Sequence, residues 1–412
     1  MNWTGSIAFI AASLASGLGA IPASAQEFGL RDSVSGVLVV GVAHGSGETP
    51  GLEGGFGKLN VGNDKSLPYA QSVVAWHPRL TQRLGAVVSV SGTLAEHATG
   101  GLDEAYFTLR ADPGAGLRLS GRAGIFFPPI SLEHDGDDWS PRYTLTPSMI
   151  NSWVAEEVKT VGVELTARGQ VFNRPAGLTV AVFGGNDTSG ALLAFRGWAQ
   201  HDRRAVVAGH FKIAPLSAMF QGGQGANSRS IDEVDNRPGT YGRFEMAVSD
   251  TLDISLFAYD NGGDRKTIVA GQYAWRTRFG QAALRWNPSR KTEVIAQAMT
   301  GNTGMGSRIG SQYPADIGFA AIFGLVSRAV GPGNIALRAE QFSIDDRSFK
   351  ATDNNAEHGW SGTASWSQPV SARTQIVAEG TLAQSDRPSR ARVGLSRAQT
   401  AISVRAALKT QF

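Results

Sequence analysis

The densest group of side chains with potential chemistry is the segment Glu133-His134-Asp135-Gly136-Asp137-Asp138, in which carboxylates surround one glycine. Carboxylate oxygens are the ligands that Ca²⁺ prefers, and a glycine permits the sharp turn of a cation-binding loop. The spacing does not fit an EF-hand, because that loop needs a bidentate Glu at its twelfth position. We therefore interpret the segment as a solvated acidic loop and predict no metal site.

Arginines supply the opposite charge and recur at alternate positions. Arg118 and Arg122 fall on one side of the alternating segment Leu117–Phe126, while small and apolar residues fall on the other. Each arginine has a second interpretation, a structural residue paired with a neighbouring carboxylate or with water. The further candidates are Arg276, Arg278, Arg285, Arg338 and Arg405.

The sequence does not carry the motifs of enzymes or of nucleotide-binding proteins. There is no G-x-S-x-G elbow and no H-E-x-x-H zinc motif, and the seven histidines have no nucleophile at a suitable spacing. The Gly-rich stretch that ends in Gly57-Lys58 is not a phosphate loop, because Leu59 stands where Ser or Thr is required. With no cysteine and a net charge of +3, we expect no catalytic residue, no cofactor and no nucleic-acid partner.

Alternation of apolar and polar residues runs along most of the chain and indicates β-strands. In the last segment, Ala401–Phe412, Ile402 and Val404 share one face while Arg405 and Lys409 share the other. The body of the chain has no run of about 20 apolar residues, so helical membrane spans are not expected. We predict an all-β protein, a transmembrane antiparallel up-and-down β-barrel of 16–18 strands.

Connections between the predicted strands alternate in length. Short turns rich in Pro, Gly or Asp, such as 331–333, are followed by longer polar segments, such as 301–315. The longest connection is Phe127–Val158, and the count of 18 strands includes Ala191–Gln200 and Ala205–Phe220. Bacterial membrane barrels have short periplasmic turns and longer outer loops, so the pattern predicts which end of the barrel faces outward.

Residues 1–25 are interpreted as a cleaved secretory signal. The segment Ile7–Ile21 is apolar, and Ala23-Ser24-Ala25 has the small-x-small form of a cleavage site. The region before the apolar run has no Lys or Arg, which departs from the usual pattern, and a single N-terminal anchor helix is the competing interpretation. The predicted organisation is a signal at 1–25 and a barrel at 26–412.

Tryptophans lie near the ends of several predicted strands. Their amphipathic rings favour the boundary between lipid and water, so we expect an aromatic girdle there. Its predicted members are Trp76, Trp198, Trp275, Trp286, Trp360 and Trp366.

The chain resembles Gram-negative outer-membrane porins. The resemblance rests on the leader ending in Ala23-Ser24-Ala25, the alternating strands, the long loop Phe127–Val158 and the terminal strand that closes on Phe412. It implies a bacterial outer-membrane location, contact with lipid, passive diffusion of small hydrophilic solutes or ions, and no enzymatic activity. A homotrimer is implied by the resemblance alone.

In that family the third outer loop folds into the lumen and narrows it, and the last strand is read by the barrel assembly machinery. The resemblance gives Phe127–Val158 the role of the constriction loop and Phe412 that of the assembly signal. Acidic side chains of the loop would face arginines across the pore and create a transverse field. The acidic candidates are Glu133, Asp135, Asp137 and Asp138, and the basic candidates are Arg118, Arg122, Arg276, Arg278, Arg338 and Arg405, with Arg285 beside them.

Two other interpretations stay open. A closed barrel whose outer loops bind a partner or a surface polysaccharide would have bulky apolar residues at lumen positions. A secreted all-β carbohydrate-binding protein would leave the alternating connections and the terminal Phe412 unexplained.

Overall fold

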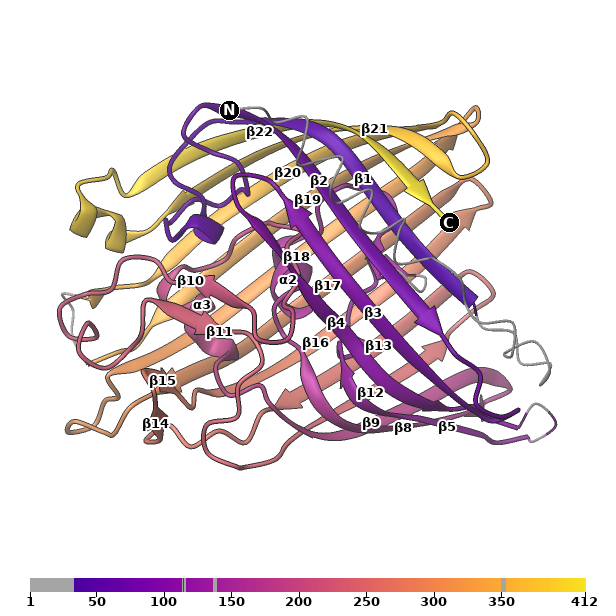
Figure 1. The fold of residues 1–412 in the computed structure, drawn as a ribbon, viewed down its shortest axis with the longest axis horizontal. Helices are drawn as coiled ribbons and strands as arrows, with labels where there is room; N and C mark the ends of the chain where they lie inside the picture. Colours follow the sequence, from indigo (N-terminus) through magenta and orange to yellow (C-terminus); the bar gives the residue numbers. More distant parts are fainter. Residues whose placement is uncertain (1–32, 113, 115, 136–138, 350–352) are drawn as a thin grey trace, which may run out of the picture.

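The chain forms a closed antiparallel β-barrel (Figure 1). The computed structural model describes residues 33–112, 114, 116–135, 139–349 and 353–412, so the predicted signal lies outside the described residues. Strand β22 pairs with β1 and closes the barrel at 16 strands, which confirms the predicted fold at the lower strand number. Within the described ranges, no helix has the length and apolar character to cross a membrane.

The barrel strands are joined in sequence order. Their bounds are β1 Ser33–Gly45, β2 Lys65–His77, β3 Leu84–Leu94, β4 Ala98–Leu109, β5 Arg118–Phe126, β8 Thr160–Val171, β9 Arg174–Gly184, β12 Gly239–Ala247, β13 Leu252–Asp260, β16 Arg276–Ser289, β17 Thr292–Met305, β18 Ala315–Val330, β19 Gly333–Asp346, β20 Glu357–Pro369, β21 Thr374–Asp386 and β22 Ala398–Gln411.

The remaining elements lie in the connections. They are the helices η2 Gly51–Glu53, α2 Met149–Val154, α3 Ser189–Phe195 and η4 Pro388–Val393, and the short strand pairs β6 His134–Asp135 with β7 Ser140–Pro141, β10 His210–Lys212 with β11 Asn227–Arg229, and β14 Ile268–Val269 with β15 Gln272–Tyr273.

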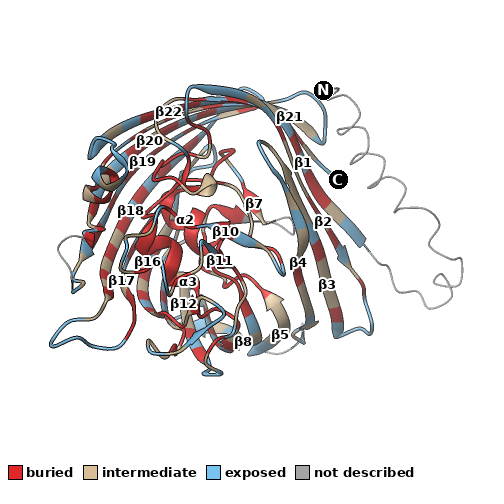
Figure 2. Ribbon diagram, turned by 60° about the vertical axis from the view of Figure 1, so that its left-hand side comes forward, coloured by how far each residue is buried: buried red, intermediate tan, exposed pale blue. Residues whose placement is uncertain are grey.

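The two ends of the barrel differ in their connections, as predicted. At the turn end, neighbouring strands are joined by short segments such as 172–173 and 331–332. At the loop end, the connections include the long segments 127–159 and 185–238. We call these two the first and the second inner segment, because both carry buried elements that lie inside the barrel wall (Figure 2).

Alternation along the strands separates an outward face from a lumen face. In β22, Ile402, Val404 and Leu408 are about half exposed on the outside, whereas Arg405 and Lys409 are buried on the inside. This is the division expected when the outward face is in contact with an apolar medium and the inner face is polar.

Four of the six tryptophans predicted for the girdle lie on outward strand faces, and two do not. Exposed on outward strand faces are Trp76, Trp286, Trp360 and Trp366. Trp198 and Trp275 are instead 0% exposed, because both belong to connections that pack inside the barrel. They were predicted to lie near strand ends because the segments that contain them were wrongly assigned to strands.

The predicted strands Ala191–Gln200 and Ala205–Phe220 are wrong. They belong to the second inner segment, where residues 191–195 form most of helix α3 and the chain beyond them is largely irregular. All residues of α3 after Ser189 are buried. A helix satisfies its own backbone hydrogen bonds, so it can pack inside the barrel without joining the sheet. Removing these two strands from the predicted 18 gives the observed 16.

Aromatic packing fills the interior beside strands β9–β19, which we call the packed side. Trp153 of α2 lies 5.2 Å from Phe319 and 5.4 Å from Phe279 between ring centroids, and 6.0 Å from Trp198. Burying a large apolar side chain contributes roughly 1.5–3 kcal/mol. The inner segments are therefore held in the barrel by a hydrophobic core of their own.

Helix α3 approaches the wall so closely that its first turn requires glycine. A Cβ at Gly190 would lie 1.9 Å from Thr303 Oγ1 and 2.9 Å from Thr277 Oγ1. Those two hydroxyls, on β17 and β16, are hydrogen-bonded to each other at 2.7 Å. No side chain fits between the helix and this pair.

Two buried cations from other loops hold the end of α3. Arg387 donates to the carbonyl oxygens of Ala194 and Phe195 at 3.1 and 3.0 Å. Lys58 donates to the carbonyl oxygen of the C-cap residue Arg196 at 3.3 Å. The last carbonyls of a helix have no partner within it and carry partial negative charge, so these cations stabilise the inserted helix.

Candidate pore and its charged residues

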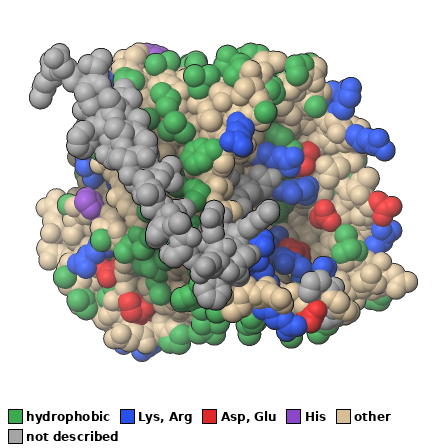
Figure 3. Space-filling view, turned by 45° about the vertical axis from the view of Figure 1, so that its right-hand side comes forward, with side chains coloured by type: hydrophobic (Ala, Val, Ile, Leu, Met, Phe, Trp, Pro, Cys, Tyr) green, Lys and Arg blue, Asp and Glu red, His purple; other side chains and the backbone are tan. Residues whose placement is uncertain are grey.

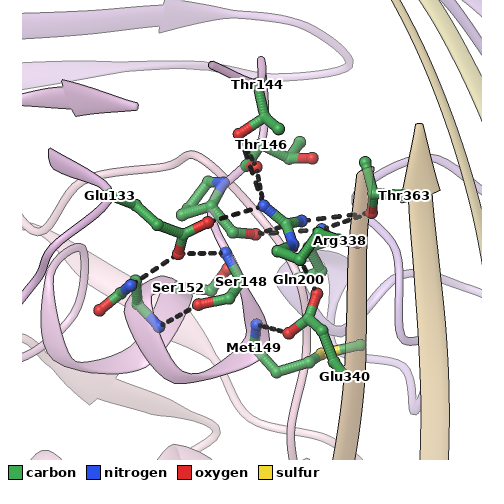
Figure 4. Close-up of polar contacts among 12 residues, drawn as sticks. Glu133, Thr144, Thr146, Ser148, Met149, Ser152, Gln200, Arg338, Glu340 and Thr363 are labelled. Atoms are coloured by element: carbon green, nitrogen blue, oxygen red, sulfur yellow. Dashed lines mark hydrogen bonds and ion pairs between the residues drawn. The ribbon is translucent and has the colours of Figure 1, made fainter. Parts of the chain in front are cut away.

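Glu133 of the predicted acidic loop is buried against the barrel wall and is not solvated. Its Oε1 accepts a hydrogen bond from Arg338 Nη1 at 2.8 Å, and its Oε2 accepts from Ser148 N at 2.8 Å and Asn151 Nδ2 at 2.6 Å (Figure 4). The two side chains of the ion pair are 2% and 0% exposed. Glu133 and the wall arginine are therefore in direct contact, and the role of this pair at a constriction stays a prediction.

Arg338 on β19 uses its guanidinium to fasten the first inner segment. Besides Glu133, it donates to Glu340 Oε1 at 2.8 Å and to the carbonyl oxygens of Thr146 and Pro147 at 2.8 and 3.0 Å. A fully coordinated, buried guanidinium has little capacity left for a passing solute. Arg338 therefore holds the first inner segment against the wall of the packed side.

The other three acidic predictions cannot be placed in the same way. Asp137 and Asp138 lie outside the described residues, and for Asp135 only the backbone, in β6, is described. Their role at a constriction stays a prediction.

Arg405 on β22 meets the second inner segment. Its Nη1 lies 2.5 Å from Asp202 Oδ2, and its guanidinium lies 4.9 Å from the centroid of the Tyr69 ring. Asp202 also accepts a hydrogen bond from Asn60 Nδ2 at 3.1 Å. This ion pair differs from the one at Arg338 because it borders open space.

Two cavities follow the inner faces of β1–β4, which we call the hollow side. The outer cavity, of about 60 Å³, extends from His97 near the loop end to Gln71 and Asp202. The inner cavity, of about 50 Å³, shares Gln71 and Asp202 and extends to Val37, near the turn end of β1. One water molecule needs roughly 10–15 Å³ by this measure, so each cavity holds a few waters. Asp202 lines both cavities and therefore lies where they meet.

The inner cavity is lined by groups of both signs. Arg204 pairs with Asp103 at 2.9 Å, and Lys409 Nζ donates to the carbonyl oxygen of Pro141 at 2.7 Å. Burial raises the pKa of Glu156 to about 8, although the charge of Arg204 opposes this change. Glu156 is therefore mostly neutral at pH 7, and the cavity lining is more basic than its composition suggests.

Arg122 lies on the lumen face of β5 and is engaged with the wall. Its Nε and Nη2 donate to the two carboxylate oxygens of Glu164 at 2.9 and 3.0 Å, and Nη2 also reaches the carbonyl oxygen of Phe127 at 2.8 Å. The guanidinium lies 4.1 Å from the centroid of the Phe126 ring. It positions the start of the first inner segment.

Arg118 lies at the turn end, in a recess of about 290 Å³. Its charged lining residues are Arg118, Arg168, Arg243 and Arg285 with Glu245 and Asp253. Figure 3, in which the turn end comes forward, shows Lys and Arg side chains gathered in a hollow with acidic side chains among them. The recess forms a basic vestibule.

Arg276 and Arg278 do not line the lumen, contrary to the prediction. In β16 the buried, inward residues are Thr277, Phe279 and others at odd positions, so the two arginines share the outward face. Both bind Asp260 on β13, at 2.8 and 2.9 Å. The prediction named Arg276, Arg278 and Arg285 together, but the first two lie on the face opposite to Arg285, because side chains alternate along a strand.

Several charged residues of the interior were not predicted. Asp202 and Arg204 lie at 201–204, the connection between the two predicted strands Ala191–Gln200 and Ala205–Phe220, and no lumen role was expected for this connection. Arg168 could have been found, because it shares an alternating face with Glu164. No signal in the sequence distinguishes Arg243.

A buried chain of hydrogen bonds joins Ser131, His134 and Glu156, the residue types of a hydrolytic triad. Ser131 Oγ lies 2.8 Å from His134 Nδ1, and His134 Nε2 lies 3.0 Å from Glu156 Oε1. Ser131 Oγ also accepts backbone N–H bonds from Glu133 and His134, both at 3.1 Å. The hydroxyl therefore caps a local turn, and the histidine and glutamate side chains are at most 2% exposed.

Three carboxylates with metal-ligand spacing gather in the second inner segment, at Asp187, Glu233 and Asp235. Asp187 Oδ2 accepts from Val234 N at 2.7 Å, and Glu233 Oε2 accepts from Gly185 N at 2.7 Å. Their oxygens thus accept hydrogen bonds from backbone amides of the loop. This structural role accounts for the cluster without a metal ion.

Comparison with solved structures identifies the architecture. The outer-membrane channel DcaP of Acinetobacter baumannii aligns with a TM-score of 0.58 at 10% identity, over 93% of this chain and 97% of that chain. The anion-selective porin of Comamonas acidovorans gives 0.51 at 13% identity, over 93% and 100%. OprB of Pseudomonas putida gives 0.52 at 10%, over 92% and 94%. The chain has a porin-type fold.

This porin-type barrel is recognised by structure alone, since no family model and no curated protein sequence matches the chain. Its interior combines a packed side, a hollow side with two small cavities, and a basic vestibule at the turn end.

Proposed function

We propose that the protein is an outer-membrane porin through which small hydrophilic solutes or ions diffuse passively along the hollow side. The loop end faces the exterior, the turn end faces the periplasm, and the apolar outward face is in contact with lipid. The observation that carries the proposal is the pair of adjoining cavities, lined by charged groups, that runs along β1–β4.

The size and charge of this route define what it passes. Cavities that hold a few waters admit inorganic ions and the smallest solutes. The Asp202–Arg405 pair, where the cavities meet, supplies a local field across the route, and Arg204 and Lys409 follow it towards the periplasm. A low-dielectric wall keeps such a field poorly screened.

Phe412 ends the strand that closes the barrel. Its backbone exchanges hydrogen bonds with Gly36 of β1 at 2.9 and 3.1 Å. As the aromatic end of the last strand, it is the proposed signal to the barrel assembly machinery. A homotrimer is proposed as well, since a Vibrio cholerae outer-membrane protein with a TM-score of 0.50 is described in a trimer form.

A surface-binding barrel is the second candidate function. It is favoured by the bulky apolar residues at lumen positions of the packed side, including Phe257, Phe279 and Phe319. In that case the inner segments would plug the barrel and the outer loops would bind a partner.

Single-channel recording of the purified protein in planar bilayers separates the two. The porin proposal expects small, discrete, ohmic current steps in simple salts. Complete absence of conductance at all voltages would contradict it and favour the plugged barrel. If current is seen, neutralising Asp135, Asp137 and Asp138 together is expected to shift the reversal potential towards anions, and an unchanged potential would remove these residues from the constriction.

A further inference from the structure

A charged groove lies on the outward face of the barrel near the loop end, away from the lumen. Its volume is about 940 Å³, and it is bounded by the outer ends of β16–β19 and the loops beside them. Its basic lining residues are Arg237, Arg265, Lys266, Arg276, Arg278 and Arg347, and its acidic ones are Asp264, Asp316 and Asp345.

The groove retains an excess of positive charge and of hydrogen-bond donors. Arg276 and Arg278 share one carboxylate, that of Asp260, at 2.8 and 2.9 Å. Counting Asp260 with the acidic lining residues leaves six basic against four acidic groups. Two buried donors, Arg276 Nε and Arg265 Nη1, have no acceptor among the described residues. Guanidinium groups with free N–H donors bind phosphate in a bidentate manner.

An apolar groove of about 600 Å³ lies beside the charged one, on the outward faces of β8, β9, β12 and β13. Val163 and Val182 are cross-strand partners on its wall, each more than half exposed. Gly242 and Ala258 are partners on its floor. A Cβ at Gly242 would have its nearest neighbour at 3.9 Å, so the floor is open space outside the sheet.

The two grooves meet at Asp260, which lines the apolar groove and binds both arginines. The basic groove lies at the level of the strand ends and adjoins an apolar groove over the strands. This arrangement is complementary to an amphiphile with an anionic head group and an acyl chain. We propose that this outward face binds one phosphate-bearing lipid of the outer leaflet, with its phosphate at Arg276 and Arg278 and an acyl chain over Gly242 and Ala258. The inference rests on the proposed outer-membrane location.

Native mass spectrometry of the full chain in detergent tests the proposal, with bisphosphorylated lipid A as the probe and its dephosphorylated form and inorganic phosphate as comparisons. We expect the wild-type protein to retain one lipid molecule. The variant Arg278→Gln should bind this lipid about tenfold more weakly, because a charge-assisted hydrogen bond to the phosphate is lost. The matched control is Arg328→Gln, which removes a charge from the outward face of β18 at the turn end and should bind normally.

The acyl-chain part is tested separately by filling the groove. Gly242→Leu should weaken binding to a similar extent without changing charge, whereas Gly380→Leu, an outward glycine of β21 with open space around it, should not. Heat-modifiable migration on gels verifies that each variant is folded.

Three results would overturn the proposal. These are equal retention of the dephosphorylated lipid, equal retention by Arg278→Gln and wild type, and dissociation of an oligomer by Gly242→Leu, which would make this face an interface between copies of the chain. Loss of lipid binding with normal conductance would refute the inference alone, and lipid binding without conductance would refute only the porin proposal.

Discussion

The packed side and the hollow side of the barrel interior use the same wall in opposite ways. Beside β9–β19, inward aromatic rings and helices α2 and α3 exclude water, whereas beside β1–β4 polar side chains and the Asp202–Arg405 pair border two cavities. The inner segments therefore determine the proposed route by the part of the wall that they leave uncovered. Buried ion pairs occur on both sides, and on the hollow side the Asp202–Arg405 pair adjoins open space.

The largest expected effect is on the packed side. Arg338→Met leaves Glu133 and Glu340 buried without their cation, which should lower the free energy of unfolding by about 3–5 kcal/mol. The control Arg278→Met breaks an ion pair at an arginine that is 52% exposed and should cost less than about 1 kcal/mol. Urea unfolding in detergent micelles measures both, and equal losses would contradict the anchoring role of Arg338.

Gly190 provides a second test of the packed side. Gly190→Val should push α3 from the Thr277–Thr303 pair and destabilise the barrel by about 1–3 kcal/mol, since overpacking forces side chains and backbone to shift. Gly362→Val, on the outward face of β20 with open space around it, is the control. A tolerated valine at 190 would show that α3 is not held against β16 and β17.

The contrast between the sides also explains what the sequence could predict. Period-two alternation, as in β22, reveals strands and faces because every residue alternates between two environments. The two cavities of the proposed route could not be predicted, because they depend on how residues 185–238 fold back into the barrel. Five apolar residues at 191–195 fit a buried strand as well as a buried helix, and periodicity alone does not separate these in a short run.

The charged residues show the same limit. Arg405 was placed on the lumen face because its strand alternates without interruption. Its partner Asp202 lies far away in sequence and could be found only from the fold. Arg276 and Arg278 were counted as lumen candidates together with Arg285, although the period of two places them on the opposite face. Gly280 and Ala282 also give the outward side of β16 little apolar signal.

On the hollow side, Asp202→Asn should change conduction more than stability. Without the carboxylate, Arg405 loses its ion-pair partner where the cavities meet, and the anion-to-cation permeability ratio should rise about fivefold, for a field change of about 1 kcal/mol. Reversal potentials in a salt gradient measure this ratio. The control is Asp250→Asn, which breaks the exposed Arg174–Asp250 ion pair at the turn end. An equal shift of the reversal potential in this control would contradict the proposed route.

The smallest expected effect is a pH dependence at Glu156. Burial raises its pKa to about 8, so the carboxylate gains its charge as pH rises through 8 and should reduce anion preference about twofold between pH 7 and 9. The facing groups are His134, His201 and Arg204, together with the carboxylates of Asp103 and Asp202. Because the pKa of Glu156 is higher in the folded state, its contribution to stability should also fall as pH rises from about 4.5 to 8. In Glu156→Gln both pH effects should vanish, and their persistence would assign them to another group.

The most direct measurement of the route uses the absence of cysteine from the chain. Thr93 lines both cavities, while Val90 lies on the outward face of the same strand. A negatively charged methanethiosulfonate reagent should reduce the single-channel current of Thr93→Cys by roughly half or more and leave that of Val90→Cys unchanged. Full current through completely modified Thr93→Cys would contradict a pathway along the hollow side.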